Sequence, residues 1–376
     1  MIRFNVAPQS GNELKYFTQV LQEGYFAGDG PFAIRCEKKL QELLGSERVF
    51  LTPSGTAALE MACMLAEIGP GDEMIVPSFT FSTSAASAVQ FGGTPVFVDI
   101  RPDTMNIDET KIEAAITPRT KAIMVVHYAG VACEMDTIME IAKRHHLLVI
   151  EDAAQAIDAY YKGKPLGTIG DFGCFSFHAT KNIAMGEGGC IAINNPAYVK
   201  RAYHIRDSGT DAYDFENGLV SAYSWVDKGS SYLPSEFQCA YLYGQLEKLA
   251  EIQNQRLLSW EQYYHELETV KEITLPFIPD GCTHNAHMFY IKTSDNKTRE
   301  DLRLFLKKQE IYAVFHYSPL HSSRAGKRFG CSVDDCPYTT SESARLLRLP
   351  MYYGLQKEEI HTVCEAIKAY YRGEEA

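Results

Sequence analysis

The chain reads Phe175-Ser176-Phe177-His178-Ala179-Thr180-Lys181-Asn182 and, shortly afterwards, Gly186-Glu187-Gly188-Gly189-Cys190. This arrangement predicts a glycine-rich turn between two apolar strands, with Lys181 in the turn. Most lysines are solvated surface charges, but this one directly follows an apolar run and has no amphipathic helix around it. A buried amine with a lowered pKa is what Schiff-base chemistry requires. We therefore predict that Lys181 is a catalytic residue and that His178 caps or packs locally.

A second polar cluster follows the apolar run Leu147-Leu148-Val149-Ile150, where the sequence continues Glu151-Asp152-Ala153-Ala154-Gln155. The carboxyl end of a strand is where α/β folds place their ligand sites. Asp152 is therefore predicted to face a cleft, and the small Ala153 and Ala154 leave space for a flat ring. A carboxylate here can cap a helix, bind a metal or pair with a ring nitrogen. The local sequence leaves these three roles open.

The third feature is the turn Thr52-Pro53-Ser54-Gly55-Thr56-Ala57-Ala58-Leu59, where a strand is followed by small residues and a helix. The first N–H groups of a helix have no intrahelical partner and lie at its positive end. Gly55 lets a phosphate approach closely, and Ser54 and Thr56 add hydroxyl donors. The turn predicts an anion site or an ordinary helix cap. No Gly-x-Gly-x-x-Gly run opens this βα unit, which argues against dinucleotide binding.

The three features together meet the needs of pyridoxal 5'-phosphate (PLP). This cofactor needs an anchored phosphate, a carboxylate that keeps its pyridinium nitrogen protonated, and a lysine that holds its aldehyde. The helix start at Gly55, the strand-end Asp152 and the Lys181 turn supply one group each. The combination is far more specific than any of its parts.

The periodicity of the chain predicts an α/β architecture with a mostly parallel, seven-stranded sheet between helices, followed by a smaller α+β domain. We expect a large domain over residues 1–235 and a small domain over residues 236–376. The expected strands are Arg48–Leu51, Met74–Pro77, Pro95–Asp99, Ala122–His127, Leu147–Glu151, Phe172–Phe177 and Cys190–Ile193. The expected helices are Thr56–Ile68, Ser82–Phe91, Met135–Arg144 and Pro196–Arg206, and beyond them lie helical stretches at Ser235–Leu267, 299–308 and 357–371 and a strand at Met288–Thr293.

The overall composition limits the partners and the compartment. A net charge of −12 repels nucleic acid and anionic membranes, so an anionic substrate needs a locally positive pocket. The ten cysteines contain no C-x-x-C pair, and no secretory leader precedes Met1-Ile2-Arg3-Phe4. No apolar run is long enough to span a bilayer. We predict a cytoplasmic protein whose cysteines are reduced thiols and which binds no nucleic acid, membrane or metal.

The chain resembles the sugar-nucleotide aminotransferases of the aspartate-aminotransferase fold, which is PLP fold type I. The resemblance runs nearly end to end and rests on the Asp152 and Lys181 motifs together with Gly28-Asp29-Gly30-Pro31, Pro77-Ser78-Phe79-Thr80-Phe81, Val126-His127-Tyr128-Ala129-Gly130 and His316-Tyr317-Ser318-Pro319-Leu320-His321. It implies that Lys181 forms the Schiff base, Asp152 pairs with the ring nitrogen and Gln155 hydrogen-bonds the ring hydroxyl. It also implies that Phe81 stacks on the ring and that the phosphate is held by Ser176, Gly55 and Thr56.

One position departs from the family pattern. Many relatives place an asparagine from a neighbouring subunit on the phosphate, within Gly-x-Asn-Tyr, whereas this chain reads Gly229-Ser230-Ser231-Tyr232. Ser231 either donates one hydrogen bond to the cofactor or is an ordinary turn serine. The resemblance implies a homodimer in which Ser231 and Tyr232 face the partner's cofactor.

The finer resemblance is to family members that aminate C4 of dTDP-4-dehydro-6-deoxy-D-glucose with L-glutamate and give the galacto amine. It rests on residues 101–110, on Gly130–Asp136 and on Asn285-Ala286-His287-Met288-Phe289-Tyr290. It implies a role in cell-surface polysaccharide biosynthesis. Donors available to such a substrate are Tyr25, Gly28, Arg206, His316 and His321, each of which could equally be structural.

Three other classes of protein remain as alternatives. A dehydratase of the same fold is expected to lack the Schiff-base lysine, whereas Lys181 is present. A catalytically silent PLP-fold regulator is disfavoured because Lys181, Asp152 and Gln155 are all retained. A nucleotide-dependent oxidoreductase is disfavoured by the missing glycine fingerprint. Within the aminotransferases, formation of the gluco epimer or amination of another keto-sugar nucleotide stays open.

Overall fold

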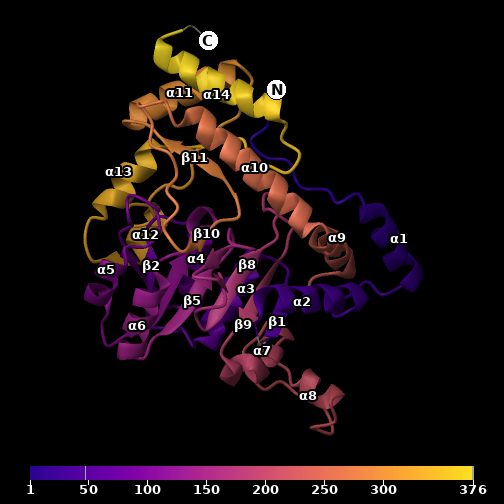
Figure 1. The fold of residues 1–376 in the computed structure, drawn as a ribbon. Coiled ribbons are helices and arrows are strands. Elements are labelled where there is room, and N and C mark those ends of the chain that lie inside the picture. Colours follow the sequence, from indigo (N-terminus) through magenta and orange to yellow (C-terminus); the bar gives the residue numbers. More distant parts are fainter. Residues whose placement is uncertain (47, 375–376) are drawn as a thin grey trace.

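A central sheet of eight strands organises the chain in the computed structural model, which describes residues 1–46 and 48–374 (Figure 1). The strand order is β1-β9-β8-β5-β4-β2-β3-β12, and β9 runs antiparallel to both of its neighbours while the other pairings are parallel. The seven predicted strands are all present, and β12 adds an eighth edge strand from much later in the chain. The bounds are β1 Arg48–Thr52, β2 Glu73–Pro77, β3 Thr94–Val98, β4 Thr120–Val126, β5 Leu148–Asp152, β8 Phe172–Ser176, β9 Gly189–Ile193 and β12 Cys331–Ser332.

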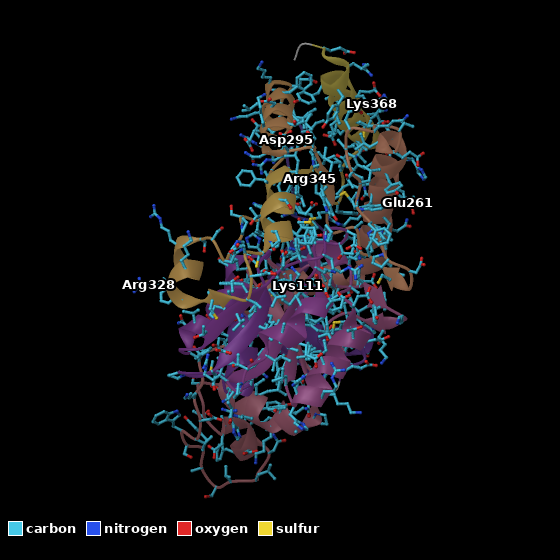
Figure 2. The ribbon with its side chains drawn as sticks, turned by 90° about the vertical axis from the view of Figure 1, so that its left-hand side faces the viewer. Lys111, Glu261, Asp295, Arg328, Arg345 and Lys368 are labelled. Atoms are coloured by element: carbon cyan, nitrogen blue, oxygen red, sulfur yellow. The ribbon has the colours of Figure 1, made fainter. Side chains whose placement is uncertain are left out.

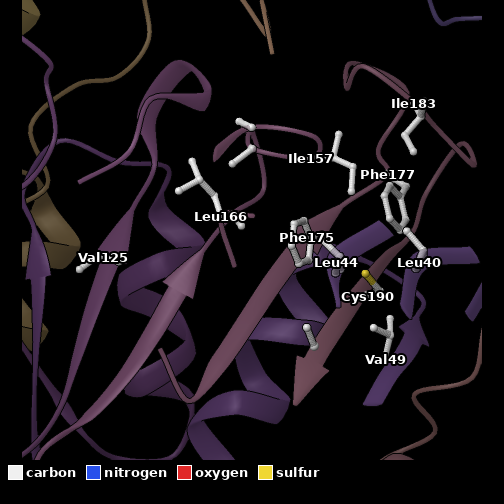
Figure 3. Close-up of a cluster of buried hydrophobic side chains, with 14 of the residues drawn as sticks. Leu40, Leu44, Val49, Val125, Ile157, Leu166, Phe175, Phe177, Ile183 and Cys190 are labelled. Carbon is white, nitrogen blue, oxygen red and sulfur yellow. The ribbon is translucent and has the colours of Figure 1, made fainter. Parts of the chain in front are cut away.

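Helices cover both faces of this sheet. Because strand side chains alternate between the faces, Ile123 and Val125 of β4 join one hydrophobic cluster while Ala122 and Met124 join another. The helices of this part of the chain are α1 Glu13–Glu23, α2 Pro31–Leu44, α3 Gly55–Leu65, α4 Ser82–Gln90, α5 Glu109–Ile112, α6 Met135–His145, α7 Val199–Arg206 and α9 Glu236–Glu247. Figure 3 shows the first cluster, where Leu40 and Leu44 of α2 pack against Val49, Phe175 and Cys190 of the sheet.

A second unit lies above the sheet in Figure 1 and is built around the antiparallel pair β11 Phe289–Lys292 and β13 Leu346–Leu349. A separate hydrophobic cluster holds it together, with contributions from Ile2 at the N-terminus and from Ile367 near the C-terminus. Its helices are α10 Leu249–Leu267, α11 Asn296–Lys308, α13 Pro337–Arg345 and α14 Lys357–Arg372. The remaining short elements are α8 Ala212–Glu216, α12 Arg324–Phe329, β6 Tyr160–Tyr161, β7 Lys164–Pro165 and β10 Cys282–Thr283.

The change from one core to the other falls inside α10. Cys239 and Ala240 of α9 belong to the cluster of the large sheet, whereas Trp260 and Tyr263 of α10 belong to that of the second unit. The expected helical stretch Ser235–Leu267 is interrupted at Lys248. The domain boundary at residue 235 therefore remains a prediction. That boundary assigns α9 to the small domain, although α9 packs in the hydrophobic cluster of the large sheet.

A segment of the C-terminal half, around β12, also contacts the large sheet. Lys111 of α5, which is labelled in Figure 2, forms ion pairs with Asp99, 3.2 Å away, and with Asp334, 3.0 Å away. Asp99 in turn accepts hydrogen bonds from the backbone N–H groups of Tyr338 and Thr339. This network fixes the segment around β12 beside β3. No helix among the described residues combines the length and the apolar character needed to cross a bilayer.

Candidate active site

A cavity of about 530 Å³ opens at the carboxyl ends of the parallel strands, between the large sheet and the second unit. Both units contribute to its walls, because strand ends of the large sheet supply one side and residues near β11 and β13 supply the other. The predicted site residues that line it are Gly55, Thr56, Phe81, Asp152, Gln155, Ser176, Lys181 and His316. Residues more than 250 positions apart in the sequence therefore meet in one space.

The start of α3 forms an anion-binding corner of this cavity. Ser54 caps the helix by accepting a hydrogen bond of 3.0 Å from the Ala57 N–H, and the preceding N–H groups of Gly55 and Thr56 have no intrahelical acceptor. A side chain at position 55 would place its Cβ only 2.9 Å from Ser176 Cβ, so glycine is needed for α3 to approach β8. That approach brings the Ser176 hydroxyl beside the helix start, where all three donors can meet one phosphate.

Asp152 lies at the opposite, buried part of the cavity and is only 5% exposed. Its Oδ2 accepts a hydrogen bond of 2.7 Å from the Ser84 hydroxyl, and its Oδ1 accepts one of 3.2 Å from the Ala154 N–H. Desolvation raises the pKa of this carboxyl, whereas the two hydrogen bonds and the charge of Lys181 oppose that effect. In the part of the chain that the structure describes, β5 is followed by turns and then by β6, so Asp152 does not cap a helix. A bound cation such as a protonated ring nitrogen fits this carboxylate.

Lys181 is half-buried in the turn that follows β8. The pKa of its ammonium is lowered to about 8, mainly by desolvation, while the Asp152 carboxylate opposes the lowering and the cation of Arg348 adds to it. The adjacent Asn182 fixes the turn, since its amide donates to the Gln253 side chain at 2.9 Å and to the Asn285 carbonyl at 2.7 Å. A lysine held in this way is partly neutral near physiological pH, as a nucleophile requires.

Gln155 is oriented by the backbone of the neighbouring loop. Its Oε1 accepts a hydrogen bond of 2.7 Å from the Ala129 N–H, which leaves the amide Nε2 to donate to the Tyr317 hydroxyl at 3.3 Å. The donor side of Gln155 therefore faces the cavity, as required for a bond to a ring hydroxyl. Phe81 is 54% exposed and offers an aromatic face in the same cavity.

Five predicted residues do not line the cavity of this chain: Tyr25, Gly28, Arg206, Ser231 and His321. Arg206 is 4% exposed, and its cation pairs with Asp29. His321 shares a hydrogen bond of 2.6 Å with the Ser78 hydroxyl, and the Tyr25 hydroxyl donates to the Gly28 carbonyl at 3.0 Å. Ser231 is exposed. These contacts are internal to the chain, and Arg206 is not among the residues that line the cavity.

Tyr232, which was expected to face a partner's cofactor, is instead 6% exposed and lies in the hydrophobic cluster beneath α3. Its hydroxyl donates to Glu60 at 3.3 Å. The Tyr232 N–H also donates to the Arg206 carbonyl at 3.0 Å, so contacts within the chain hold this residue inward.

The cavity residues that were not predicted from the sequence include Asn5, His287, Tyr317 and Arg348. Arg348 had a detectable signal, because it is a single charge inside the apolar run Leu346-Leu347-Arg348-Leu349. A charged residue in a buried strand is rare unless it is paired or functional. The others carry no such local signal.

Each polar group of PLP has a matching polar group on the wall of the cavity. Two helix N–H groups and a serine suit the phosphate, the Asp152 carboxylate suits the ring nitrogen, the Gln155 amide suits the ring hydroxyl, and the Lys181 amine suits the aldehyde. The assignment of each residue to its role remains a proposal that rests on this geometry.

Comparison with known proteins agrees with this chemistry. The model of the DegT/DnrJ/EryC1/StrS aminotransferase family matches residues 9–368. The chain is 33% identical to the spore coat polysaccharide biosynthesis protein SpsC of Bacillus subtilis over 96% of this chain and 95% of that protein. It is 34% identical to GDP-perosamine synthase of Caulobacter vibrioides over 95% of each.

A solved structure is similar over its whole length. The putative sugar aminotransferase Spr1654 of Streptococcus pneumoniae, in its PMP form, has a TM-score of 0.92 and 26% identity over 99% of this chain and 100% of that one. The same protein has also been solved in its PLP form, again with a TM-score of 0.92. The fold is therefore that of PLP fold type I. The chain belongs to the DegT/DnrJ/EryC1/StrS aminotransferase family and is a PLP-dependent sugar aminotransferase.

Proposed function

We propose that this enzyme transfers the amino group of L-glutamate to C4 of dTDP-4-dehydro-6-deoxy-D-glucose. The products are dTDP-4-amino-4,6-dideoxy-D-galactose and 2-oxoglutarate, and the amino sugar serves cell-surface polysaccharide of the enterobacterial common antigen type. One observation supports this substrate above all: the three segments that carry the finer resemblance lie beside the site. Asn106 donates to the carbonyls of Val131 and Ala132. Asn285 donates to the Gln155 carbonyl and accepts from Asn182 in the lysine turn.

The residues of the cavity have distinct tasks in such a reaction. PLP, when bound, supplies an electron sink conjugated to the reacting carbon. Lys181 Nζ removes the proton from Cα of glutamate in the first half-reaction and returns a proton to C4 of the sugar in the second. Asp152 keeps a positive charge on the ring nitrogen, and Ser84 holds the carboxylate in place. One lysine therefore serves both half-reactions.

A second copy of the chain is proposed to complete the enzyme as a homodimer. The segment around α8 projects away from the sheet in Figure 1 and carries large apolar side chains in solvent, including Trp225 at 80% and Leu219 at 67% exposure. Monomeric proteins rarely leave such a contiguous apolar surface uncovered. Ser231 follows this segment and is proposed to reach the partner's phosphate site. The ten cysteines are all free thiols, which supports the proposed cytoplasmic location.

The competing candidate is a different keto-sugar nucleotide, and the likeness to GDP-perosamine synthase favours a GDP-linked one. The test is a panel of keto-sugar nucleotides with L-glutamate and other amino donors, followed by product mass and by the configuration of the new amine. The proposal expects fastest turnover with dTDP-4-dehydro-6-deoxy-D-glucose and an axial amine. Preference for the GDP sugar, formation of the gluco epimer, or amination at C3 would overturn the substrate assignment and leave the family assignment intact.

A further inference from the structure

Two buried hydroxyl groups, those of Thr80 and Ser84, form a hydrogen-bonded chain that ends on Asp152. Ser84 donates a hydrogen bond of 2.7 Å to Asp152 Oδ2, and the hydroxyl oxygens of Thr80 and Ser84 lie 2.8 Å apart. Thr80 is 2% exposed and Ser84 is fully buried. Thr80 and Asp152 line the cavity, whereas Ser84 is not among its lining residues. Ser84 can therefore act on a bound ligand only through another residue.

The fold brings this hydroxyl chain to Asp152 from another strand of the sheet. Thr80 follows β2, and Ser84 lies in the first turn of α4, which begins at Ser82. In the sheet, β2 is separated by β4 from β5, the strand that ends at Asp152. The first turn of α4 therefore reaches across the end of β4. The positive end of a helix dipole also favours a carboxylate at this place.

The direction of the hydrogen bonds in the chain follows from the charge of Asp152. An ionised carboxylate accepts hydrogen bonds and has none to donate, and a hydroxyl has one hydrogen to give. The Ser84 hydrogen is therefore used on Asp152, and the Ser84 oxygen accepts from the Thr80 hydroxyl. Thr80 thus polarises Ser84, and Ser84 in turn stabilises the negative charge. Hydrogen bonds in such a chain strengthen one another in a low-dielectric interior.

The chain makes a large contribution to the ionised form of Asp152. Burial raises the pKa of this carboxyl, and the hydrogen bond from Ser84 is the largest effect that opposes burial. The Ala154 N–H and the charges of Lys181 and His127 follow in that order. Lys181 is the residue proposed to react with the cofactor, so its ammonium is not a permanent partner of the carboxylate. The Ser84 hydroxyl takes no part in the proposed chemistry, and its hydrogen bond can persist.

Two further titratable groups near Asp152 are neutral. Burial raises the pKa of the Cys174 thiol and of the Tyr317 hydroxyl, and the charge of Asp152 adds to both increases. Neither group supplies a positive charge that could replace the hydroxyl chain.

We propose that Thr80 and Ser84 are positioning residues that keep Asp152 ionised, so that the proton shared with the cofactor's ring nitrogen stays on the nitrogen. The inference rests on the proposed role of Asp152. Hydrogen bonds to the charged form of a carboxyl favour that form. Without the Ser84 hydroxyl, the proton moves from the ring nitrogen to Asp152 and both groups become neutral. A neutral ring is a weaker electron sink for the reacting carbon.

The experiment loads the enzyme with PLP that carries ¹⁵N in its ring and compares Ser84→Ala and Thr80→Val with the matched control Ser87→Ala. Ser87 is a buried serine of α4 whose hydroxyl donates to the Ser84 carbonyl at 3.1 Å. The ¹⁵N chemical shift reports whether the nitrogen carries a proton, kinetics give kcat, and thermal melts report the fold.

Ser84→Ala should move the shift towards that of an unprotonated nitrogen and lower kcat about tenfold to a hundredfold. Thr80→Val should move the shift in the same direction and lower kcat about twofold to fourfold. Ser84→Thr, which keeps the hydroxyl, should retain the wild-type shift. Ser87→Ala should also retain this shift, with kcat within about twofold of the wild type.

A double variant tests whether Thr80 acts through Ser84. Thr80→Val combined with Ser84→Ala should match Ser84→Ala alone in ring shift and in kcat, because the chain is already broken at Ser84. Fully additive effects would refute the role of Thr80. An unchanged ring shift in Ser84→Ala, or an equal change in Ser87→Ala, would overturn the whole inference. An unprotonated ring nitrogen in the wild-type enzyme would instead contradict the proposed role of Asp152, and failure to bind PLP would contradict the proposed function.

Discussion

His287 Nδ1 lies 2.9 Å from Asn182 Oδ1, and this pair joins the lysine turn to the second unit. Both amide hydrogens of Asn182 are already donated to Gln253 and Asn285, so Oδ1 must accept and His287 Nδ1 must carry the proton. His287 Nε2 is then an acceptor on a residue that lines the cavity. The position and the chemistry of Lys181 therefore depend on residues about a hundred positions further along the chain.

Replacement of Lys181 tests the proposed Schiff base. The wild-type enzyme should show a visible absorption band that borohydride fixes covalently to Lys181, because among the described residues Lys181 is the lysine that lines the cavity. Lys181→Ala should lose the linkage and at least about a hundredfold in turnover, while the exposed Lys164→Ala should retain both. Peptide mass mapping after reduction locates the linkage, and a Lys181→Ala enzyme with full turnover would refute the role.

Replacement of Asp152 distinguishes a role of this carboxylate in catalysis from a role in the stability of the fold. Asp152→Asn keeps the shape and an acceptor for Ser84 but removes the charge that holds a proton on the ring nitrogen. We expect turnover to fall by about two to four orders of magnitude with little change in Tm, because no helix depends on this side chain. Turnover is measured beside thermal melts. A variant that melts early yet turns over normally would show that the role is structural.

The pH dependence of stability tests the environment of Lys181 in the cofactor-free enzyme. Its folded-state pKa, about 8, lies below the ordinary value of 10.5, so the unfolded state binds more protons between these values. Its contribution to the free energy of unfolding should therefore rise with pH from about 8 to 10.5, by at most about 1.4 kcal/mol per pH unit. Urea titrations of the apo wild type and Lys181→Met measure it. A constant difference between the two across this range would contradict the prediction.

The close approach of α3 to β8 is tested by adding one methyl group. Gly55→Ala places a Cβ 2.9 Å from Ser176 Cβ, so the helix start must move and the phosphate donors separate. We expect the Kd of PLP to rise about tenfold, which corresponds to about 1.4 kcal/mol. Fluorescence or absorbance titration of the apoenzyme measures it. Ser176→Ala removes one donor without moving the helix and should have a smaller effect, and equal PLP affinity in all three proteins would argue against a phosphate site here.

The proposed role of the projecting segment around α8 in the homodimer is tested by measuring how readily the dimer dissociates. Trp225 is 80% exposed and Leu219 is 67% exposed, so their replacement by serine should leave the fold of one chain unchanged. The dimer should dissociate more readily, because its apolar contact area is reduced. Sedimentation velocity over a dilution series gives the dissociation constant, with Leu258→Ser, an exposed apolar residue of α10, as control. A fully active wild-type monomer would refute the dimer.

Much of the architecture and the centre of the site could be predicted from local patterns. All seven expected strands are present because buried strands form continuous apolar runs that need no distant partner to be recognised. The groups at Gly55, Asp152 and Lys181 could be found for a related reason. Each lies at the carboxyl end of a strand or within five residues of it, and parallel strands bring their carboxyl ends to one edge of a sheet.

The sequence by itself therefore determined the sheet, the cofactor and the lysine turn, whereas only the tertiary structure decided the opposite wall of the cavity. β12 joins β3 across more than 230 residues, β13 pairs with β11, and Arg348 lines the same cavity as Lys181 because of that pairing. Arg206 was expected at the substrate and instead pairs with Asp29. Hydrophobic periodicity reports whether a residue is buried, but the partner of a buried charge is set by contacts between distant segments, for which local sequence holds no signal.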